Sequence, residues 1–163
     1  MLNLKRTGLL AAACLLTLAS WTAPALAGET VKVSLSETSA DMDLTMKMGM
    51  GMGGDMGKAT MFLKANPATV KAGEVTFQVL NESKTVVHEM ILAAVADAAK
   101  PMPFNQNENR VDEDKAGDLG EVSELEPGKS GTLTVTLKPG TYLLYCNIPG
   151  HYMAGMWMTI IAK

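Results

Sequence analysis

A cysteine, a histidine and a methionine stand at five-residue intervals near the C-terminus of this 163-residue chain. They are Cys146, His151 and Met156 in the stretch YLLYCNIPGHYMAGMWM, which begins at Tyr142. The chain has one other histidine, His88, in the apolar stretch TVVHEMIL. Copper sites that transfer single electrons use one thiolate and two imidazoles in a plane, with a weak thioether outside it. Because thiolate and thioether favour Cu(I) and imidazoles satisfy Cu(II), these four side chains predict a copper ion that cycles between both states.

Each of these residues has an ordinary structural explanation when it is considered alone. A histidine such as His88 on an apolar strand is more often a hydrogen-bonded core residue than a ligand. A lone Cys146 would be a small buried hydrophobe, and Met156 would fill the core. The joint spacing reverses these interpretations, because one copper ion explains all four residues together. Met153 and Met158 are weaker candidates for the thioether, since the first follows the second histidine too closely and the second falls within the last predicted strand.

The cysteine content narrows the chemistry further. The chain has two cysteines, and Cys14 lies in an N-terminal segment that we expect to be removed. Cys146 then has no partner for an internal disulfide. A single cysteine in an oxidising compartment is a reactive thiol, an intermolecular bridge or a metal ligand. Hydrolytic catalysis by a Cys–His pair is possible in principle, but it would leave the methionine unexplained. Metal ligation therefore agrees best with the neighbouring residues.

Residues 1–27 have the pattern of a secretory signal peptide. Lys5-Arg6 precedes an apolar run of about 14 residues, which is too short to span a bilayer. Pro24-Ala-Leu-Ala27 then supplies small residues for cleavage. We expect a single mature domain of residues 28–163, located in the periplasm or otherwise exported. Lipidation at Cys14 is a less favoured alternative, because the apolar run continues past it.

The charge balance argues against nucleic acid as a partner. The chain has 14 basic and 17 acidic residues, with no basic stripe that could hold a phosphate backbone. Acidic residues gather between Asp112 and Glu124, where they either steer a basic redox partner or form a solvated loop. No segment of the mature chain is apolar and long enough to be a transmembrane segment. We expect a soluble monomer.

Short strands separated by turn signals recur along the mature chain. Turns are expected at Lys71-Ala-Gly, Glu126-Pro-Gly and Lys138-Pro-Gly. The predicted strands are 31–35, 61–64, 74–80, 86–93, 131–137, 141–145 and 157–162. Alternating residues such as Thr132-Leu-Thr-Val-Thr-Leu137 are typical of half-buried strands. This spacing predicts an all-β sandwich or barrel. Residues 97–121 break the rhythm, and we expect them to be a long surface connection between two strands, with room for one short helix.

Residues 41–58 form a low-complexity insert of methionine, glycine and aspartate, DMDLTMKMGMGMGGDMGK. Its several glycines and few β-branched residues predict a flexible loop. Met46, Met48, Met50 and Met52 alternate with other residues, so an extended chain would direct their thioethers to one face. Several thioethers together could hold Cu(I) as a secondary site. A loop that covers an apolar surface or scavenges oxidants explains the same residues, and both interpretations remain open.

The chain resembles the cupredoxins, the small type 1 blue copper proteins of the plastocyanin and azurin kind, over about residues 60–163. The resemblance lies in Asn66-Pro-Ala-Thr-Val-Lys-Ala-Gly-Glu-Val-Thr-Phe77, in Val87-His88 and in the loop with the spacing Cys-x4-His-x4-Met. It implies a Greek-key β-sandwich or barrel of about eight strands. It also implies copper near one end of the sandwich, with His151 as the ligand closest to solvent.

Some features depart from the pattern that is common in that family. Its loop length is nearer to rusticyanin and sulfocyanin than to plastocyanin. Glu89 stands where the family often has an asparagine after the upstream histidine, whereas Asn147 follows Cys146. Groups that surround metal ligands orient them and tune the metal. We therefore expect Glu89 and Asn147 to surround the copper ligands, and Tyr145 occupies the aromatic position often found before the cysteine.

These observations favour an exported type 1 copper protein that carries single electrons between redox partners. The resemblance implies partners such as a c-type cytochrome or a terminal reductase or oxidase. The alternative is a periplasmic copper-tolerance protein that buffers or delivers copper, with the methionine insert as a Cu(I) site. We expect no enzymatic activity, because copper enzymes of this kind need additional histidines and both histidines of the chain are already assigned.

Overall fold

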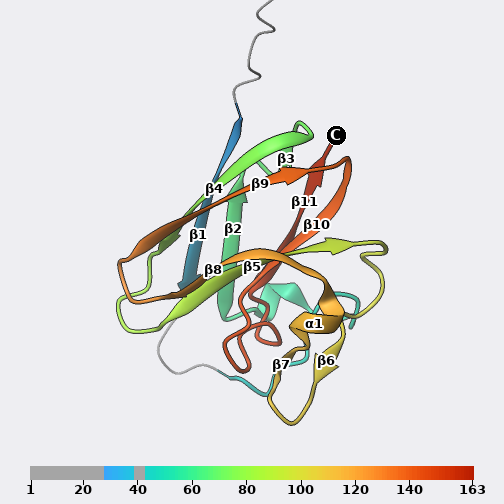
Figure 1. The fold of residues 1–163 in the computed structure, drawn as a ribbon. Helices are drawn as coiled ribbons and strands as arrows, with labels where there is room; N and C mark the ends of the chain where they lie inside the picture. Colours follow the sequence, from blue (N-terminus) through green and yellow to red (C-terminus); the bar gives the residue numbers. More distant parts are fainter. Residues whose placement is uncertain (1–27, 39–42) are drawn as a thin grey trace, which may run out of the picture.

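The computed structural model describes residues 28–38 and 43–163, so the predicted signal peptide and residues 39–42 lie outside the described residues. In the described ranges the chain has eleven strands, one short α-helix and one short 3-10 helix. A four-stranded and a five-stranded sheet form the two layers, and two further strands form a small hairpin (Figure 1). The predicted all-β sandwich is confirmed. No helix in these ranges has the length and apolar character needed to cross a bilayer.

The four-stranded sheet has the strand order β2-β1-β4-β9. Its strands are β1 (Glu29–Glu37), β2 (Met61–Asn66), β4 (Gly73–Asn81) and β9 (Ser130–Leu137). β1 runs parallel to β4, while the other two pairs are antiparallel. Apolar and polar residues alternate along β1, so Val31, Val33 and Leu35 are buried and the residues between them are more exposed. This sheet therefore turns one face toward the main core, which is the larger cluster of buried apolar side chains and contains residues of both sheets.

The five-stranded sheet has the order β3-β11-β10-β5-β8 and carries the candidate ligands. Its strands are β3 (Thr69–Val70), β5 (His88–Val95), β8 (Asp118–Leu125), β10 (Gly140–Tyr145) and β11 (Trp157–Ala162). The neighbouring strands β5 and β10 bury residues on both faces, which explains their continuous apolar sequences. On β5, Met90 and Leu92 belong to the main core, whereas Ile91 and Ala93 belong to a second cluster.

The second cluster covers the outer face of β5 and β10. Its buried members are Met50, Ile91, Ala93, Met102, Val111, Ala116, Leu143, Tyr145, Tyr152 and Met153. Each large apolar side chain that is fully buried contributes about 1.5–3 kcal/mol. The methionine insert supplies one of these residues, and its described part contains a single regular element, the 3-10 helix η1 (Met56–Lys58). The insert is thus a loop, as predicted, and it is packed against the domain.

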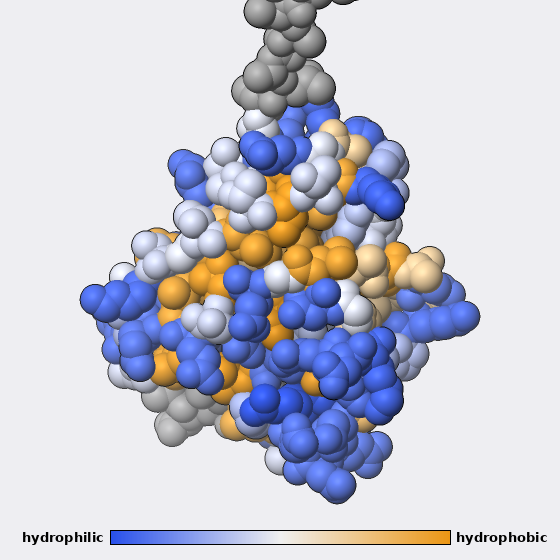
Figure 2. Space-filling view, viewed as in Figure 1, coloured by the Kyte–Doolittle hydropathy of each residue, from blue (hydrophilic) through white to orange (hydrophobic). Residues whose placement is uncertain are grey.

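Residues 97–121 are more regular than the sequence predicted. They contain the hairpin β6 (Phe104–Asn105) and β7 (Arg110–Val111), the helix α1 (Glu113–Ala116) and the start of β8. The predicted long connection is present between β5 and β8, but it ends at Gly117 rather than at residue 121, and it contains a small hairpin and a short helix. β8 lacks a clear apolar pattern because it is an edge strand that buries only Val122 and Leu125 and shifts register twice against β5. The exposed residues of the hairpin and helix make this end of the molecule hydrophilic (Figure 2).

The other predicted strands are confirmed within a few residues, although β5 begins at His88 rather than at residue 86. The hydroxyl of Ser83 accepts hydrogen bonds from the N–H groups of Thr85 and Val86, at 3.1 and 2.8 Å. The side chain of Asn81 donates to the carbonyl of Val86 at 2.8 Å. These bonds hold the chain in a turn ahead of the strand, and they fix the position at which His88 enters the sheet.

Candidate metal centre

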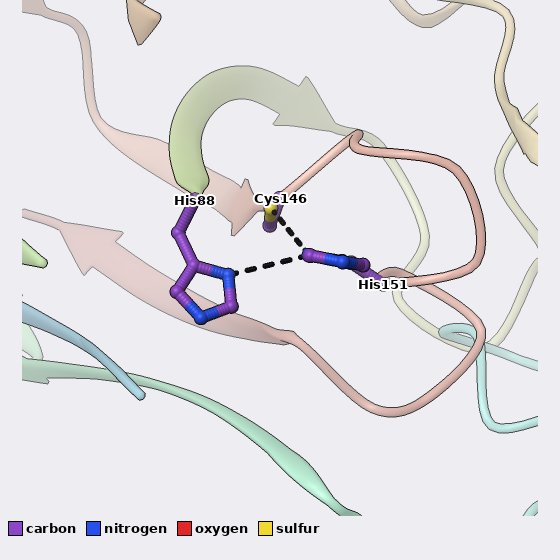
Figure 3. Close-up of side chains that lie close together, drawn as sticks. All are labelled: His88, Cys146 and His151. Atoms are coloured by element: carbon purple, nitrogen blue, oxygen red, sulfur yellow. Dashed lines mark hydrogen bonds between the residues drawn. The ribbon is translucent and has the colours of Figure 1, made fainter. Parts of the chain in front are cut away.

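Three of the predicted ligands meet at one end of the sandwich. His88 begins β5, Cys146 directly follows β10, and His151 lies in the loop between β10 and β11. One donor atom of each residue lies within 4.8 Å of the other two, and all three residues are buried. Figure 3 shows the two imidazoles beside the sulfur of Cys146. The fold therefore brings these side chains close enough together to hold one copper ion.

The Nδ1 atoms of the two imidazoles face each other. Nδ1 of His88 lies 3.2 Å from Nδ1 of His151, which lies 3.4 Å from Sγ of Cys146. Two ring nitrogens and one sulfur are the donors that electron-transfer copper sites use in their plane. The arrangement thus matches the chemistry that the sequence predicted.

Backbone hydrogen bonds fold the ligand loop, residues 146–156, into a compact turn. The N–H of Cys146 donates to the carbonyl of Met156, and the N–H of Met156 donates to the carbonyl of His151, both at 3.1 Å. Gly150 adopts φ = +87°, a conformation that side chains with a Cβ rarely adopt. The two ends of the loop are therefore tied together, and three predicted ligands are held on one short segment.

Two segments distant in sequence hold the ligand loop from outside. The N–H of Met48, in the methionine insert, donates to the carbonyl of Met153 at 2.9 Å. The carbonyl of Asn109, in the β6–β7 hairpin, accepts from the N–H of Gly150 at 2.7 Å. In Figure 1 the ligand loop lies at the lower end of the sandwich, with the insert and the hairpin beside it. Both segments therefore help to enclose the site.

The candidate ligands are almost completely removed from solvent. His88, Cys146 and Met156 are 0% exposed, and His151 is 4% exposed. His151 is thus the ligand closest to solvent, as the resemblance implied, but little of its ring reaches the surface. Exclusion of water strengthens every electrostatic interaction among these side chains.

A carboxylate holds the far side of the His88 ring. Oε2 of Glu37 lies 3.0 Å from Nε2 of His88, and Oε1 accepts a 2.6 Å hydrogen bond from the hydroxyl of Ser83. Burial alone would raise the pKa of Glu37, but the hydrogen bonds from His88 and Ser83 outweigh it and hold this pKa below its usual value. An ionised Glu37 can only accept, so Nε2 of His88 carries the proton. The lone pair of the neutral ring is then on Nδ1, where the other donors converge.

Both imidazoles are neutral near pH 7. Burial lowers the pKa of His88, although the contact with Glu37 opposes the shift. Burial and the proximity of His88 lower the pKa of His151 to about 4. A histidine must be neutral to donate a lone pair to a metal. The protonation states of the two rings therefore fit a metal site.

The thiol of Cys146 also fits this role. Burial raises its pKa to about 12, while hydrogen bonds from the N–H groups of Glu89 and Ile148 oppose the shift. The bond from Glu89 to Sγ measures 3.4 Å. A thiolate in this enclosed position needs a cation beside it, and a coordinated thiol loses its proton. The sulfur therefore fits a copper ligand whose proton leaves when the metal binds.

Met156 is buried in the main core, and its backbone is bonded to Cys146 and His151. These bonds keep the methionine on the ligand loop, and its role as the axial ligand stays a prediction. Met153 packs in the second cluster instead. The N–H of Ala65 donates to Sδ of Met158 at 3.0 Å, so this sulfur is engaged with β2. Both competing methionines thus have other packing roles.

The two residues predicted to surround the ligands are buried and contact each other. Oε1 of Glu89 accepts from the N–H of Asn147 at 3.0 Å, which joins β5 to the ligand loop. Burial raises the pKa of Glu89 to about 7; the Asn147 bond opposes this shift, and the acidic side chains of β8 and α1 add to it. Glu89 is therefore poised between its neutral and charged forms near neutral pH.

The four alternating methionines of the insert are divided between interior and surface. Met48 and Met50 are buried, whereas Met46 and Met52 are partly exposed. The carbonyl of Met48 accepts a 2.7 Å hydrogen bond from the indole Nε1 of Trp157. Burial of two of these side chains agrees with a loop that covers an apolar surface. A secondary Cu(I) site on the four thioethers stays a prediction.

Sequence reasoning missed Glu37, which contacts His88, Ser83, which holds the carboxylate of Glu37, and Asn109, which contacts the ligand loop. They lie at the end of β1, in the turn before β5 and in the hairpin, so only the folded chain brings them to the site. The one signal in the sequence that could have pointed to any of them was Glu37 itself, an acidic side chain at the end of the alternating strand β1.

Comparison with known proteins gives three informative relatives. A stretch of 43 residues is 49% identical to auracyanin-B of Chloroflexus aurantiacus, and it covers 26% of this chain but only 18% of that protein. The copper-resistant cuproprotein CopI of Pseudomonas aeruginosa is 34% identical over an alignment of 122 residues, and the alignment covers 59% of this chain and 67% of that protein. The structure of auracyanin A, a blue copper protein from Chloroflexus aurantiacus, gives a TM-score of 0.52 at 22% identity, over 84% of this chain and 100% of that one. This last likeness concerns the fold alone.

The family comparison covers most of the chain. Residues 48–163 match the copper binding proteins of the plastocyanin/azurin family. The matched range contains all four predicted ligands and both strands that position them. The match, the two-layer fold and the convergence of two histidines with a cysteine support one conclusion: the chain belongs to the plastocyanin/azurin family of copper-binding proteins, the cupredoxins.

Proposed function

We propose that this protein is an exported type 1 copper protein that carries single electrons between redox partners. The observation that supports this most is the approach of donor atoms of His88, Cys146 and His151 within 4.8 Å in a buried site. With Met156 as the axial ligand, this set suits copper in both oxidation states. Copper bound there would supply the one-electron chemistry, and the protein would hold the donors in place.

The protein would contribute to electron transfer by holding the donor atoms in fixed positions. β5 and β10 are antiparallel neighbours, so the sheet fixes His88 and Cys146 relative to each other. The internal bonds of the ligand loop fix His151 in the same way. Because these donors are held by the fold itself, they need little rearrangement when the charge at the site changes. Small rearrangement favours fast electron transfer in both directions.

Electrons would leave through His151, the ligand with the most exposure. A Cβ on Gly150 would lie 2.9 Å from Cβ of Leu44, so Leu44 packs over the ligand loop next to this histidine. Leu44 is 37% exposed, so a partner that contacts it would lie against the ligand loop at the residue before His151. Partners of the expected class are a c-type cytochrome or a terminal reductase or oxidase. Their meeting place would be the periplasm or another exported location, which the predicted signal peptide supports.

The direct test is the visible and electron paramagnetic resonance spectrum of the mature protein after addition of Cu(II). A thiolate-to-copper charge-transfer band of high intensity is expected with one equivalent of copper. Cys146→Ser should abolish the band, and Ser123→Ala, an exposed substitution on β8, should leave it unchanged. A pale protein with a tetragonal copper signal would contradict the proposal.

A second candidate function is copper tolerance through binding or delivery of copper. The 34% identity to a copper-resistant cuproprotein favours it, as do the partly exposed Met46 and Met52 of the insert. Changing Met46, Met48, Met50 and Met52 together to leucine keeps the volume nearly constant while removing four thioethers. If the insert binds copper for storage or delivery, this variant should bind one equivalent less of Cu(I) than wild type. Met61→Leu, a change in the main core, should bind as much Cu(I) as wild type. Unchanged Cu(I) stoichiometry and affinity would remove this candidate.

A further inference from the structure

We propose that Glu37 is a positioning residue for the copper site: it holds the ring of His88 through Nε2, and it lowers the reduction potential by placing a partly buried negative charge behind that ring. The inference rests on the proposed type 1 site. It assigns a role to a residue from β1, a strand that contributes none of the candidate ligands.

The contact between Glu37 and His88 is short and shielded. Oε2 of Glu37 lies 3.0 Å from Nε2 of His88, and the two side chains are 9% and 0% exposed. Shielding from water makes a charge interaction several times stronger than the same interaction at the surface. Among the contacts between acidic and basic side chains of the described residues, this is the one that includes a candidate ligand, and the neutral ring of His88 takes part in it as a hydrogen-bond donor. The carboxylate is therefore the strongest local charge acting on the ligand rings.

The carboxylate is itself held in place. Its second oxygen accepts from the hydroxyl of Ser83 at 2.6 Å, and the N–H of Ser83 donates to Oδ1 of Asn81 at 3.0 Å. Asn81 also donates to the carbonyl of Leu125 at 2.8 Å, so the network reaches β8. Rotation of Glu37 away from His88 would break a chain of bonds across both sheets. The structure thus fixes the direction from which the negative charge acts.

Two consequences follow for the copper site. A carboxylate that accepts the Nε2 proton of a ligating histidine fixes its tautomer and makes its other nitrogen a better donor. For His88 that nitrogen is Nδ1, the atom that faces His151 at 3.2 Å. The negative charge also stabilises Cu(II) more than Cu(I), because the higher cationic charge gains more from it. Loss of the charge should therefore favour reduction.

Two substitutions separate these effects. Glu37→Gln removes the charge but keeps a carbonyl oxygen that can accept from His88, while Glu37→Leu removes both. Glu82→Gln is the matched control. Glu82 is exposed and lies next to Ser83, and its substitution removes the same formal charge. The reduction potential is measured by redox titration of the copper-loaded proteins. The tautomer of His88 is measured in the copper-free proteins by nitrogen-15 NMR of the imidazole.

Glu37→Gln should favour Cu(I) over Cu(II) by at least tenfold, which is 59 mV for a one-electron couple, with the Nε2–H tautomer retained. Glu37→Leu should also raise the reduction potential. In addition, its His88 should no longer be held in the single Nε2–H tautomer, and its affinity for Cu(II) should fall 10- to 100-fold. A potential in Glu37→Gln equal to that of Glu82→Gln, or an unchanged tautomer in Glu37→Leu, would overturn the proposal. If wild-type protein forms no type 1 site, the proposed function fails, whereas the copper-free NMR experiment still decides whether Glu37 holds the ring.

Discussion

The side chain of Asn147 pairs with the backbone of Val111 as an adjacent strand would. Its Oδ1 accepts from the N–H of Val111 at 2.7 Å, and its Nδ2 donates to the carbonyl of Val111 at 3.0 Å. The same Nδ2 donates to Oε1 of Glu113 at 2.6 Å. Because Asn147 directly follows Cys146, this pairing joins the β6–β7 hairpin and α1 to the segment that carries three of the predicted copper ligands.

Replacing Asn147 with alanine should destabilise the copper-free protein by about 2–4 kcal/mol, because both backbone groups of Val111 lose a buried partner. The free energy of unfolding is measured in urea. Asn107→Ala, an exposed change in the same hairpin, should stay within about 0.5 kcal/mol of wild type. Equal stability of the two variants would show that the pairing contributes nothing.

Glu89→Gln should stabilise the copper-free protein at high pH. The pKa of Glu89 is raised to about 7 from 4.5, so the folded protein favours its neutral form. The stability that this preference provides is fully present below pH 4.5 and is lost as pH rises through 7. Glutamine is neutral throughout and can still accept from the N–H of Asn147. The variant should thus be more stable than wild type by about 3 kcal/mol at pH 8.

Measuring unfolding free energies of both proteins from pH 4 to pH 8 checks the sign of this effect. The difference between them should shrink toward zero as pH falls below 5. Glu82→Gln, which changes an exposed carboxylate, should show no such pH-dependent difference. A Glu89→Gln protein that is less stable than wild type at pH 8 would mean that the charged form of Glu89 is the favoured one.

Met156→Leu should raise the reduction potential while leaving the charge-transfer band in place. Leucine keeps the core volume but removes a thioether donor, and a donor stabilises the more highly charged Cu(II). Met153→Leu and Met158→Leu are the matched controls, since both sulfurs lie outside the proposed ligand set. Redox titration of the three variants identifies the axial ligand. A shift in either control with none in Met156→Leu would reassign it.

Gly150→Ala should destabilise the ligand loop more than Gly128→Ala destabilises its turn. Both glycines have positive φ, at +87° and +73°, so alanine is strained at either position by about 1–2 kcal/mol. A Cβ at residue 150 would also lie 2.9 Å from Leu44, whereas nothing lies within 4 Å of one at residue 128. Unfolding in urea measures the difference. Equal losses would show that Leu44 moves aside without cost.

The sequence predicted the strands and ligands whose residue pattern lies within one short segment of the chain. Alternating residues predicted β9, and the continuous apolar run predicted β10, because each strand sorts its own side chains between two faces. The spacing of Cys146, His151 and Met156 predicted a site because all three share one short loop. His88 lies far from that loop in the sequence, and it was identified from the scarcity of histidine in this chain together with the resemblance to the cupredoxins.

The rest depends on pairing between distant segments. β8 buries too few residues to show a period, and its bulges obscure what remains. Glu37 reaches His88 through the packing of one sheet on the other, which no local pattern records. The enclosure of His151 likewise depends on where the methionine insert and the β6–β7 hairpin pack. Alternation predicts which side chains are inside a strand, but it does not predict which neighbour they meet.

The central claim is that Cys146, His88 and His151 bind one copper ion together. A crystal structure of the copper-loaded mature protein, with anomalous diffraction recorded at the copper edge, tests it most directly. The account predicts a single strong peak bonded to Sγ of Cys146 and to Nδ1 of both histidines. A peak elsewhere, with the cysteine sulfur beyond bonding distance of the metal, would contradict it.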